Sequence, residues 1–227
     1  MKTAAISVAQ DLQVVLDDLQ LQADLLLPDG AEGLVVFVHG SGSGRLSPRN
    51  RQVANYFAER GMGALLFDLL SETEQRLDAV TCELRFDIHL LSQRILGVVD
   101  WLQQHPQLSR LHIGLFGAST GAAAALVAAA QRPQIIHALV SRGGRTDLAG
   151  QAVAQVRAPT LQIVGGQDIA VLHLNREVSA RLHCEQHLHV VAGASHLFVE
   201  PGAMEEVARL AADWFQRYLD GGGVWHK

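Results

Sequence analysis

Residues 111–130, LHIGLFGASTGAAAALVAAA, decide the fold of this 227-residue chain. An apolar run leads into GASTG at 117–121, and an alanine-rich segment follows directly. The run is typical of a buried strand, and the alanines are typical of a helix packed close to a sheet. The two glycines allow a tight turn that holds the hydroxyl of Ser119 clear of the sheet. The stretch predicts an exposed nucleophile between a strand and a helix. The alternative is a serine that only caps the helix.

The rest of the chain repeats this alternation of strand and helix. A long apolar stripe over residues 84–102 predicts one helix, and shorter apolar runs predict early strands at 3–8 and 21–27. Further strands are predicted at 34–39, 61–68, 111–116, 135–141, 161–164 and 187–191. We therefore expect an α/β fold in which a mostly parallel central sheet carries helices on both faces. Residues 1–227 are expected to form a single domain, without a large cap domain, because no long insertion separates the strands that follow the Ser119 turn.

An acid and a base follow two later strands. Asp168 comes after the strand LQIV in a glycine turn, and His196 comes after the strand HLHVV and before the last helix. Ligands of parallel sheets bind at the carboxyl ends of the strands, so both side chains are expected near Ser119. His196 would take the serine proton, and Asp168 would hold the imidazole in the correct tautomer. Asp147 is the second candidate for the acid, and Asp168 could instead be a turn or helix-cap residue.

The glycine-rich stretch HGSGSG at 39–44 follows a buried strand. Its position predicts that the backbone N–H of Ser41 and that of Thr120, the residue after the nucleophile, form the oxyanion hole. Alternating glycines could also cradle a phosphate, but neither of the usual phosphate-binding patterns is present.

Two arginines are candidates for binding substrate. Arg45 continues the glycine-rich stretch, and Arg142 ends a predicted strand on the same edge of the sheet. Because a guanidinium matches the geometry of a carboxylate, we hypothesise that one of them binds an anionic acyl group. The alternative is that these arginines are solvated or paired with acids such as Asp68, Glu72 and Asp87.

In this order, VHGSGSG, FGASTG, VGGQD and GASHLF resemble the α/β-hydrolase superfamily, and within it the dienelactone-hydrolase-like group without a cap. The resemblance extends from residue 23 to the last helix. It implies an α/β-hydrolase fold and a Ser-His-Asp triad of Ser119, His196 and Asp168. Dienelactone hydrolases proper have a cysteine where this chain has Ser119, so their lactone substrate is not implied.

These residues predict a serine hydrolase that cleaves a small carboxylic ester through an acyl-enzyme. Thioester hydrolysis or acyl transfer by the same triad is the first alternative, and a non-catalytic ligand-binding protein is the second. No cofactor is expected. No metal is expected either, since His187 and His189 share one strand face without partners at ligand spacing.

Composition indicates which classes of partner and which cell compartment to expect. A net charge of −5 argues against nucleic acid, and no apolar stretch is long enough to span a membrane. The chain shows no signal peptide, and Cys82 and Cys184 form no disulfide framework, so a cytoplasmic protein is expected. A homodimer is possible on general grounds alone.

Overall fold

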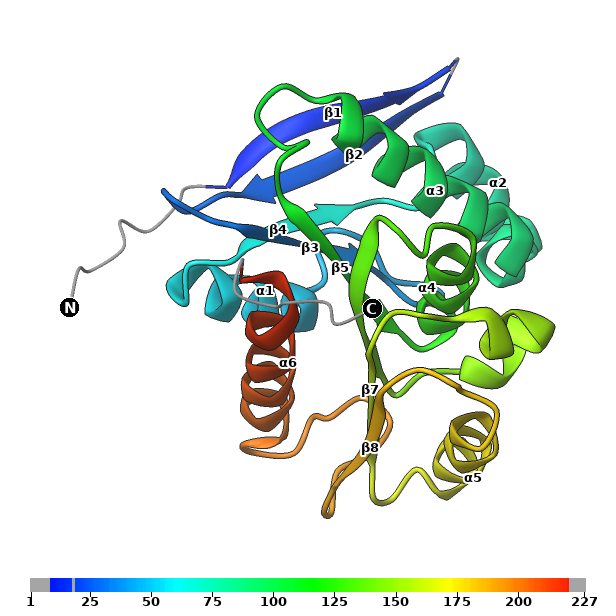
Figure 1. Ribbon diagram of the computed structural model, residues 1–227. Helices are drawn as coiled ribbons and strands as arrows, with labels where there is room; N and C mark the ends of the chain where they lie inside the picture. The colour runs from blue at the N-terminus through cyan, green and yellow to red at the C-terminus, as the bar shows by residue number, and fades with distance from the viewer. Residues whose placement is uncertain (1–8, 18, 221–227) are drawn as a thin grey trace.

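The computed structural model describes residues 9–17 and 19–220 (Figure 1). The strand predicted at 3–8 lies outside the described residues. In chain order the strands are β1 (Gln10–Leu16), β2 (Leu19–Leu26), β3 (Gly33–Val38), β4 (Gly63–Phe67), β5 (His112–Ala118), β6 (Ile136–Arg142), β7 (Thr160–Gly165) and β8 (Gln186–Val191).

The described strands form one sheet in the order β1-β2-β4-β3-β5-β6-β7-β8. The pairs β1/β2 and β2/β4 are antiparallel, and every later pair from β4/β3 to β7/β8 is parallel. The mostly parallel sheet is therefore confirmed. Strand β1 was not among the predictions; it pairs with β2 in register from Leu16↔Leu19 to Gln10↔Leu25.

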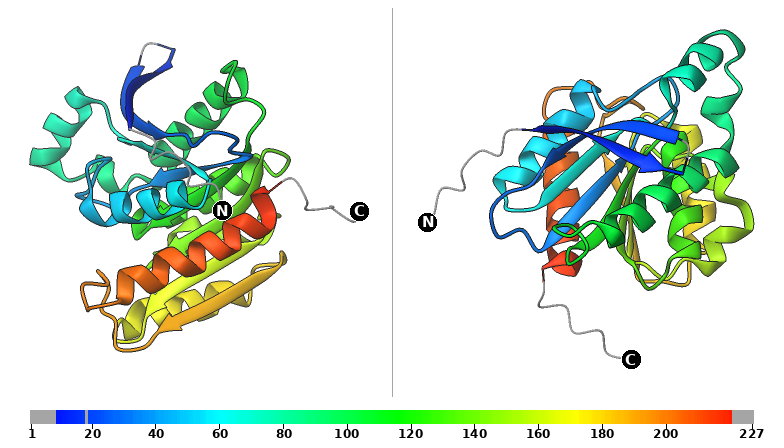
Figure 2. Two further views of the ribbon diagram at one scale, coloured as in Figure 1. Left: turned by 90° about the vertical axis from the view of Figure 1, so that its left-hand side faces the viewer. Right: turned by 90° about the horizontal axis from the view of Figure 1, so that it is seen from above.

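Helices cover both faces of the sheet, as Figures 1 and 2 show. On one face, α1 and α6 share an apolar cluster with the sheet; on the other, α3, α4 and η2 build the larger cluster. The helices are α1 (Pro48–Glu59), α2 (Glu72–Thr81), η1 (Leu84–Phe86), α3 (Ile88–Gln104), α4 (Thr120–Gln131), η2 (Thr146–Gln155), α5 (Ile169–Ser179) and α6 (Ala203–Leu219). None of the helices in the described part of the chain has the length and apolar character needed to cross a membrane.

Small side chains bring α4 against the sheet. A Cβ on Gly121 would lie 2.4 Å from the carbonyl oxygens of Val38 and His39, so only glycine allows this approach. Four alanines of the first turns, at 122–125, are fully buried beside it. The helix that carries the nucleophile at its N-terminus is thus fixed directly on the end of β3.

The segment between β4 and α3 departs from the sequence prediction. The helix predicted from residue 84 begins at Ile88, because the side chain of Asp87 accepts a hydrogen bond of 2.9 Å from the N–H of Leu90 and caps α3 there. Before it lie η1 and the helix α2, which was not predicted. Helix α2 starts at a capping box in which Ser71 and Glu74 bond each other's backbone N–H.

Candidate active site

Ser119 occupies the turn between β5 and α4 in a conformation that is rare for a residue with a side chain. Its φ is 50° and its ψ is −122°. The strained turn is held from three sides. The Ser119 N–H donates to the carbonyl of Arg142 at 3.1 Å, and the Ser119 carbonyl accepts from the N–H of Ala122 at 3.1 Å and of Arg145 at 3.0 Å. Such strain persists where surrounding structure enforces it, and it is common at catalytic positions.

The hydroxyl of Ser119 does not cap α4. Ser119 stands at the N-cap position, but its side chain makes no capping hydrogen bond. The alternative interpretation of this serine as a helix cap therefore has no support in the local geometry.

Asp168 and His196 meet across the ends of β7 and β8. Nδ1–H of His196 donates to Oδ2 of Asp168 at 2.6 Å. Asp168 precedes α5 yet makes no side-chain cap to it, so its carboxylate is engaged by the imidazole instead. The aspartate side chain is 14% exposed and the histidine side chain 39%, which leaves the ring open to a ligand while its partner is shielded.

The His196 ring lies beside the end of β6. A Cβ on Gly143 would be 3.5 Å from Nδ1 and from Cε1 of that ring, and the preceding residue, Arg142, accepts the Ser119 backbone hydrogen bond. Within the described residues, the Ser119 hydroxyl makes no direct hydrogen bond to His196. In enzymes without bound substrate, hydrogen bonds between a nucleophile and its base are often long.

The competing candidates have other partners. Both carboxylate oxygens of Asp147 accept from Arg145, each at 2.9 Å, and not from an imidazole. His189 pairs with Glu206 at 2.9 Å between β8 and α6. Across the described ranges, no group of three or more His, Cys, Asp or Glu side chains is arranged to hold a metal ion.

The glycine-rich loop that follows β3 lies directly against the nucleophile. A Cβ on Gly40 would stand 3.0 Å from the Cβ of Ser119, so glycine is what permits the contact. The N–H of Ser41 donates to Oγ1 of Thr120 at 3.0 Å. The sequence predicts that the backbone N–H groups of Ser41 and Thr120 form the oxyanion hole. In the structure the Ser41 N–H already donates to the Thr120 hydroxyl. A substrate oxygen that binds this N–H would have to displace the hydroxyl or accept from the N–H alongside it.

The loop after β3 is held in place by the carboxylates of Asp68 and Asp24, which both bind Arg45 of that loop. Asp68, at the end of β4, accepts from the Arg45 backbone N–H at 2.8 Å and lies 3.3 Å from its Nε. Asp24 of β2, which is 5% exposed, accepts from Nη1 of Arg45 at 3.2 Å and also binds Arg51. The Arg45 guanidinium is therefore occupied by protein carboxylates, which is the alternative that the sequence left open for it.

His39 was missed by the sequence reasoning. Its Nδ1–H donates to the carbonyl of Gly40 at 2.9 Å, and its Nε2 accepts from the N–H of Leu69 at 3.0 Å. Burial lowers the pKa of this imidazole and keeps it neutral, as the Nε2 acceptor role requires. His39 thus connects the loop after β3 to the loop after β4. Its place directly before the glycines was the available signal.

Arg142 ends β6 and is 9% exposed. Its Nη1 lies 3.7 Å from the Sδ of Met204, and no carboxylate of the described residues forms an ion pair with it. Burial, and then the nearby charge of Arg49, lower the pKa of its guanidinium to about 10. A buried cation without a carboxylate partner is costly for the fold.

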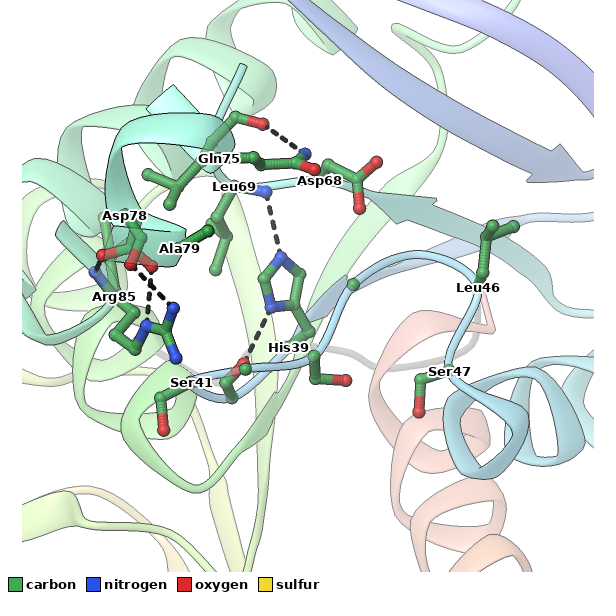
Figure 3. Close-up of a pocket in the computed structure, with 16 residues that line it drawn as sticks. His39, Ser41, Leu46, Ser47, Asp68, Leu69, Gln75, Asp78, Ala79 and Arg85 are labelled. Atoms are coloured by element: carbon green, nitrogen blue, oxygen red, sulfur yellow. Dashed lines mark hydrogen bonds and ion pairs between the residues drawn. The ribbon is translucent and has the colours of Figure 1, made fainter. Parts of the chain in front are cut away.

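A cavity of about 330 Å³ opens between the loop after β3 and the segment after β4 (Figure 3). Gly40 and Ser41 form its wall nearest to Ser119, and Gln75, Asp78 and Arg85 form the wall opposite. Neither Arg45 nor Arg142 lines it.

The sequence and the fold were compared with known protein families and solved structures. Residues 21–220 match the sequence family described as the dienelactone hydrolase family. A crystal structure of a dienelactone hydrolase from Anabaena variabilis is 48% identical and superposes with a TM-score of 0.94, covering 95% of this chain and 100% of that one. An esterase of Pyrococcus furiosus shares the fold with a TM-score of 0.70 at 16% identity, over 94% of this chain and 92% of that one.

Two curated relatives from Mycobacterium tuberculosis strains are 49% identical over 214 residues, and their name proposes a phosphoribosyl transferase. The match covers 94% of this chain and 47% of each relative, so this chain spans about half of their length.

Proposed function

Since the chain belongs to the dienelactone hydrolase family, we propose that it is a serine hydrolase that cleaves a small carboxylic ester through an acyl-enzyme. The observation that carries the proposal is the 2.6 Å hydrogen bond by which Asp168 orients His196, together with a strained Ser119 whose hydroxyl makes no capping hydrogen bond. A serine hydroxyl needs such an oriented base to become a nucleophile.

In the proposed reaction, Nε2 of His196 takes the proton of Ser119 as Oγ attacks the ester carbonyl carbon. The negative oxygen of the tetrahedral intermediate is held by the backbone N–H groups of Ser41 and Thr120. The intermediate collapses, the bond to the alcohol oxygen breaks, and His196 returns the proton to that oxygen. Water then repeats the sequence on the acyl-serine and releases the acid.

Several features support a small substrate. Each segment between consecutive strands from β5 to β8 holds a single helix, so no large cap is inserted there, and aromatic residues make up only 5% of the chain. The cavity of about 330 Å³ is near the lower end of the usual range for ligand pockets. Thioester hydrolysis or acyl transfer would use the same groups, and a binding protein would need none of them.

The name of the mycobacterial relatives proposes a different chemistry, phosphoribosyl transfer. Because this chain corresponds to 47% of their length, we assign hydrolysis to the shared part.

The proposal is tested by covalent labelling. A fluorophosphonate probe is expected to phosphonylate Ser119, with the adduct located by peptide mass spectrometry, and prior heat denaturation should abolish labelling. Failure of the folded protein to react would favour the binding-protein alternative.

Binding of an anionic acyl group by Arg142 stays a prediction. If it holds, KM for an anionic ester rises with salt in the wild type, and Arg142→Ala raises KM by about tenfold and removes the salt dependence. A neutral ester of the same size reports any general damage. Arg110→Ala is the control, because Arg110 is exposed and lies just before the amino end of β5, away from the carboxyl ends of the strands. An unchanged KM for the anionic ester in Arg142→Ala would exclude the contact.

A further inference from the structure

We propose that the cavity between the loop after β3 and the segment after β4 receives the acyl group, and that it selects acyl chains carrying a neutral oxygen acceptor, bound by Arg85. We refer to this cavity as the acyl cavity. The inference rests on the proposed function, because it needs Ser119 as the nucleophile.

The position of the acyl cavity follows from the sheet order. The cavity lies over the ends of β3 and β4, which are on one side of β5, whereas His196 follows β8 on the other side. The leaving alcohol must lie next to His196 to receive its proton. Ser119 does not itself line the cavity, but Gly40 does, and a Cβ on Gly40 would lie 3.0 Å from the Cβ of Ser119. We infer that the acyl chain, on the opposite side of the carbonyl carbon, passes over Gly40 and Ser41 into the cavity.

Arg85 presents one arm of its guanidinium to this space, as Figure 3 shows. Nε donates to Oδ2 of Asp78 at 2.6 Å, and Nη2 donates to the Asp78 carbonyl at 2.9 Å. The same carboxylate accepts from the backbone N–H of Arg85 at 3.1 Å, so the side chain is held in one orientation. Nη1 remains without a protein acceptor among the described residues, and it lies 3.8 Å from where a Cβ of Gly42 would be.

The other lining groups favour a short chain that is apolar along its length and polar at its end. Leu69, Leu70 and Leu91 supply apolar surface for methylene groups. Gln75 donates to the carbonyl of Leu70 at 2.9 Å, which fixes the amide at the cavity wall. A fixed guanidinium arm at the far side then provides a donor for a terminal oxygen.

The charge of the lining distinguishes a neutral acceptor from an anion. Asp68 and Asp78 both line the cavity, whereas Arg85 is its one cationic side chain among the lining residues. His39 is neutral because burial lowers its pKa. A ligand carboxylate would face two protein carboxylates, whereas a ketone, hydroxyl or amide oxygen can accept from Nη1 without that repulsion. Arg142 ends β6 on the other side of β5 and does not line this cavity, so the anionic acyl group predicted for Arg142 and the neutral acyl chain proposed here are alternatives, which the esters below distinguish.

Three methyl esters of matched shape test the inference: methyl 4-oxopentanoate, methyl 4-methylpentanoate and monomethyl succinate. Their acyl chains differ only in a terminal acetyl, isopropyl or carboxylate group. We expect kcat/KM, measured in a pH-stat, to be about tenfold higher for the ketone than for the isopropyl ester, and higher than for the carboxylate. The same three esters with one more methylene in the acyl chain test whether a longer chain reaches Arg85 better.

Two variants assign the preference to Arg85. Arg85→Lys keeps a cation beside Asp78 but loses the second guanidinium arm, and the double variant Asp78→Asn/Arg85→Gln removes both charges together. Both are expected to bring the ketone-to-isopropyl ratio close to one. Arg76→Lys is the matched control, since Arg76 lies on α2, pairs with Glu72 and is 78% exposed; it should keep the wild-type ratio.

The outcomes separate the two proposals. If p-nitrophenyl acetate is hydrolysed but the ketone and isopropyl esters react equally, or the ratio survives in both Arg85 variants, the acyl cavity inference is overturned. A preference for the carboxylate ester that is lost in Arg85→Lys would overturn the proposal that the bound acyl group is neutral. If no ester is cleaved and the fluorophosphonate does not label Ser119, the proposed function itself fails.

Discussion

Ser119→Ala is expected to lower kcat/KM for p-nitrophenyl butyrate by about 10⁴- to 10⁶-fold, because the proposed acyl-enzyme forms on the Ser119 hydroxyl. The measurement compares p-nitrophenyl acetate, butyrate and octanoate in wild type and variant. The short esters should be the better substrates of the wild type, since the cavity is about 330 Å³.

Two controls make this result specific to Ser119. Ser109→Ala removes an exposed hydroxyl and should change nothing. Cys82 is an exposed thiol that could itself be acylated, so residual activity is measured again after adding Cys82→Ser. Retention of more than about a tenth of the wild-type rate in Ser119→Ala with Cys82→Ser would contradict the proposed nucleophile.

Asp168→Asn is expected to lower kcat by about 10³- to 10⁴-fold with little change in KM. The amide can donate to Nδ1 of His196, which favours the tautomer whose Nε2 carries the proton and cannot accept one from Ser119. The fold should survive, since asparagine has the same shape as aspartate.

Asp147→Asn is the matched control for the acid. Asp147 was the second candidate in the sequence, and in the structure both of its carboxylate oxygens bind Arg145. We expect kcat within a few-fold of wild type for this variant. A large loss in Asp147→Asn together with a small loss in Asp168→Asn would reverse the assignment of the acid.

The turn at Ser119, the strand before it and the helix after it could be predicted from sequence because each depends on a local pattern. The GASTG turn, the apolar run before it and the alanines after it are contiguous, and the structure reproduces them as β5, Ser119 and α4. Asp168 and His196 could be proposed because parallel strands bring their carboxyl ends to one edge. That inference needs only the count and direction of strands.

Helix α2 could not be predicted from apolar periodicity because its one buried residue is the carboxylate Asp78. The spacing of Ser71 and Glu74 as a capping box was the available signal. The pairing of Arg45 with Asp24 was not visible either, since it joins the loop after β3 to strand β2, and β4 lies between these two strands in the sheet. Nothing local distinguishes such an arginine from one that binds substrate.

The attachment of α2 has a consequence for how substrate preference can change during evolution. This helix is held by the ion pairs of Glu74 with Arg94 at 2.5 Å and of Asp78 with Arg85 at 2.6 Å, and it contributes no side chain to either large apolar cluster. Substitutions along it can therefore reshape one wall of the acyl cavity without opening voids in the core. The shape of this cavity can therefore vary with helix α2 while the packing of the sheet stays the same.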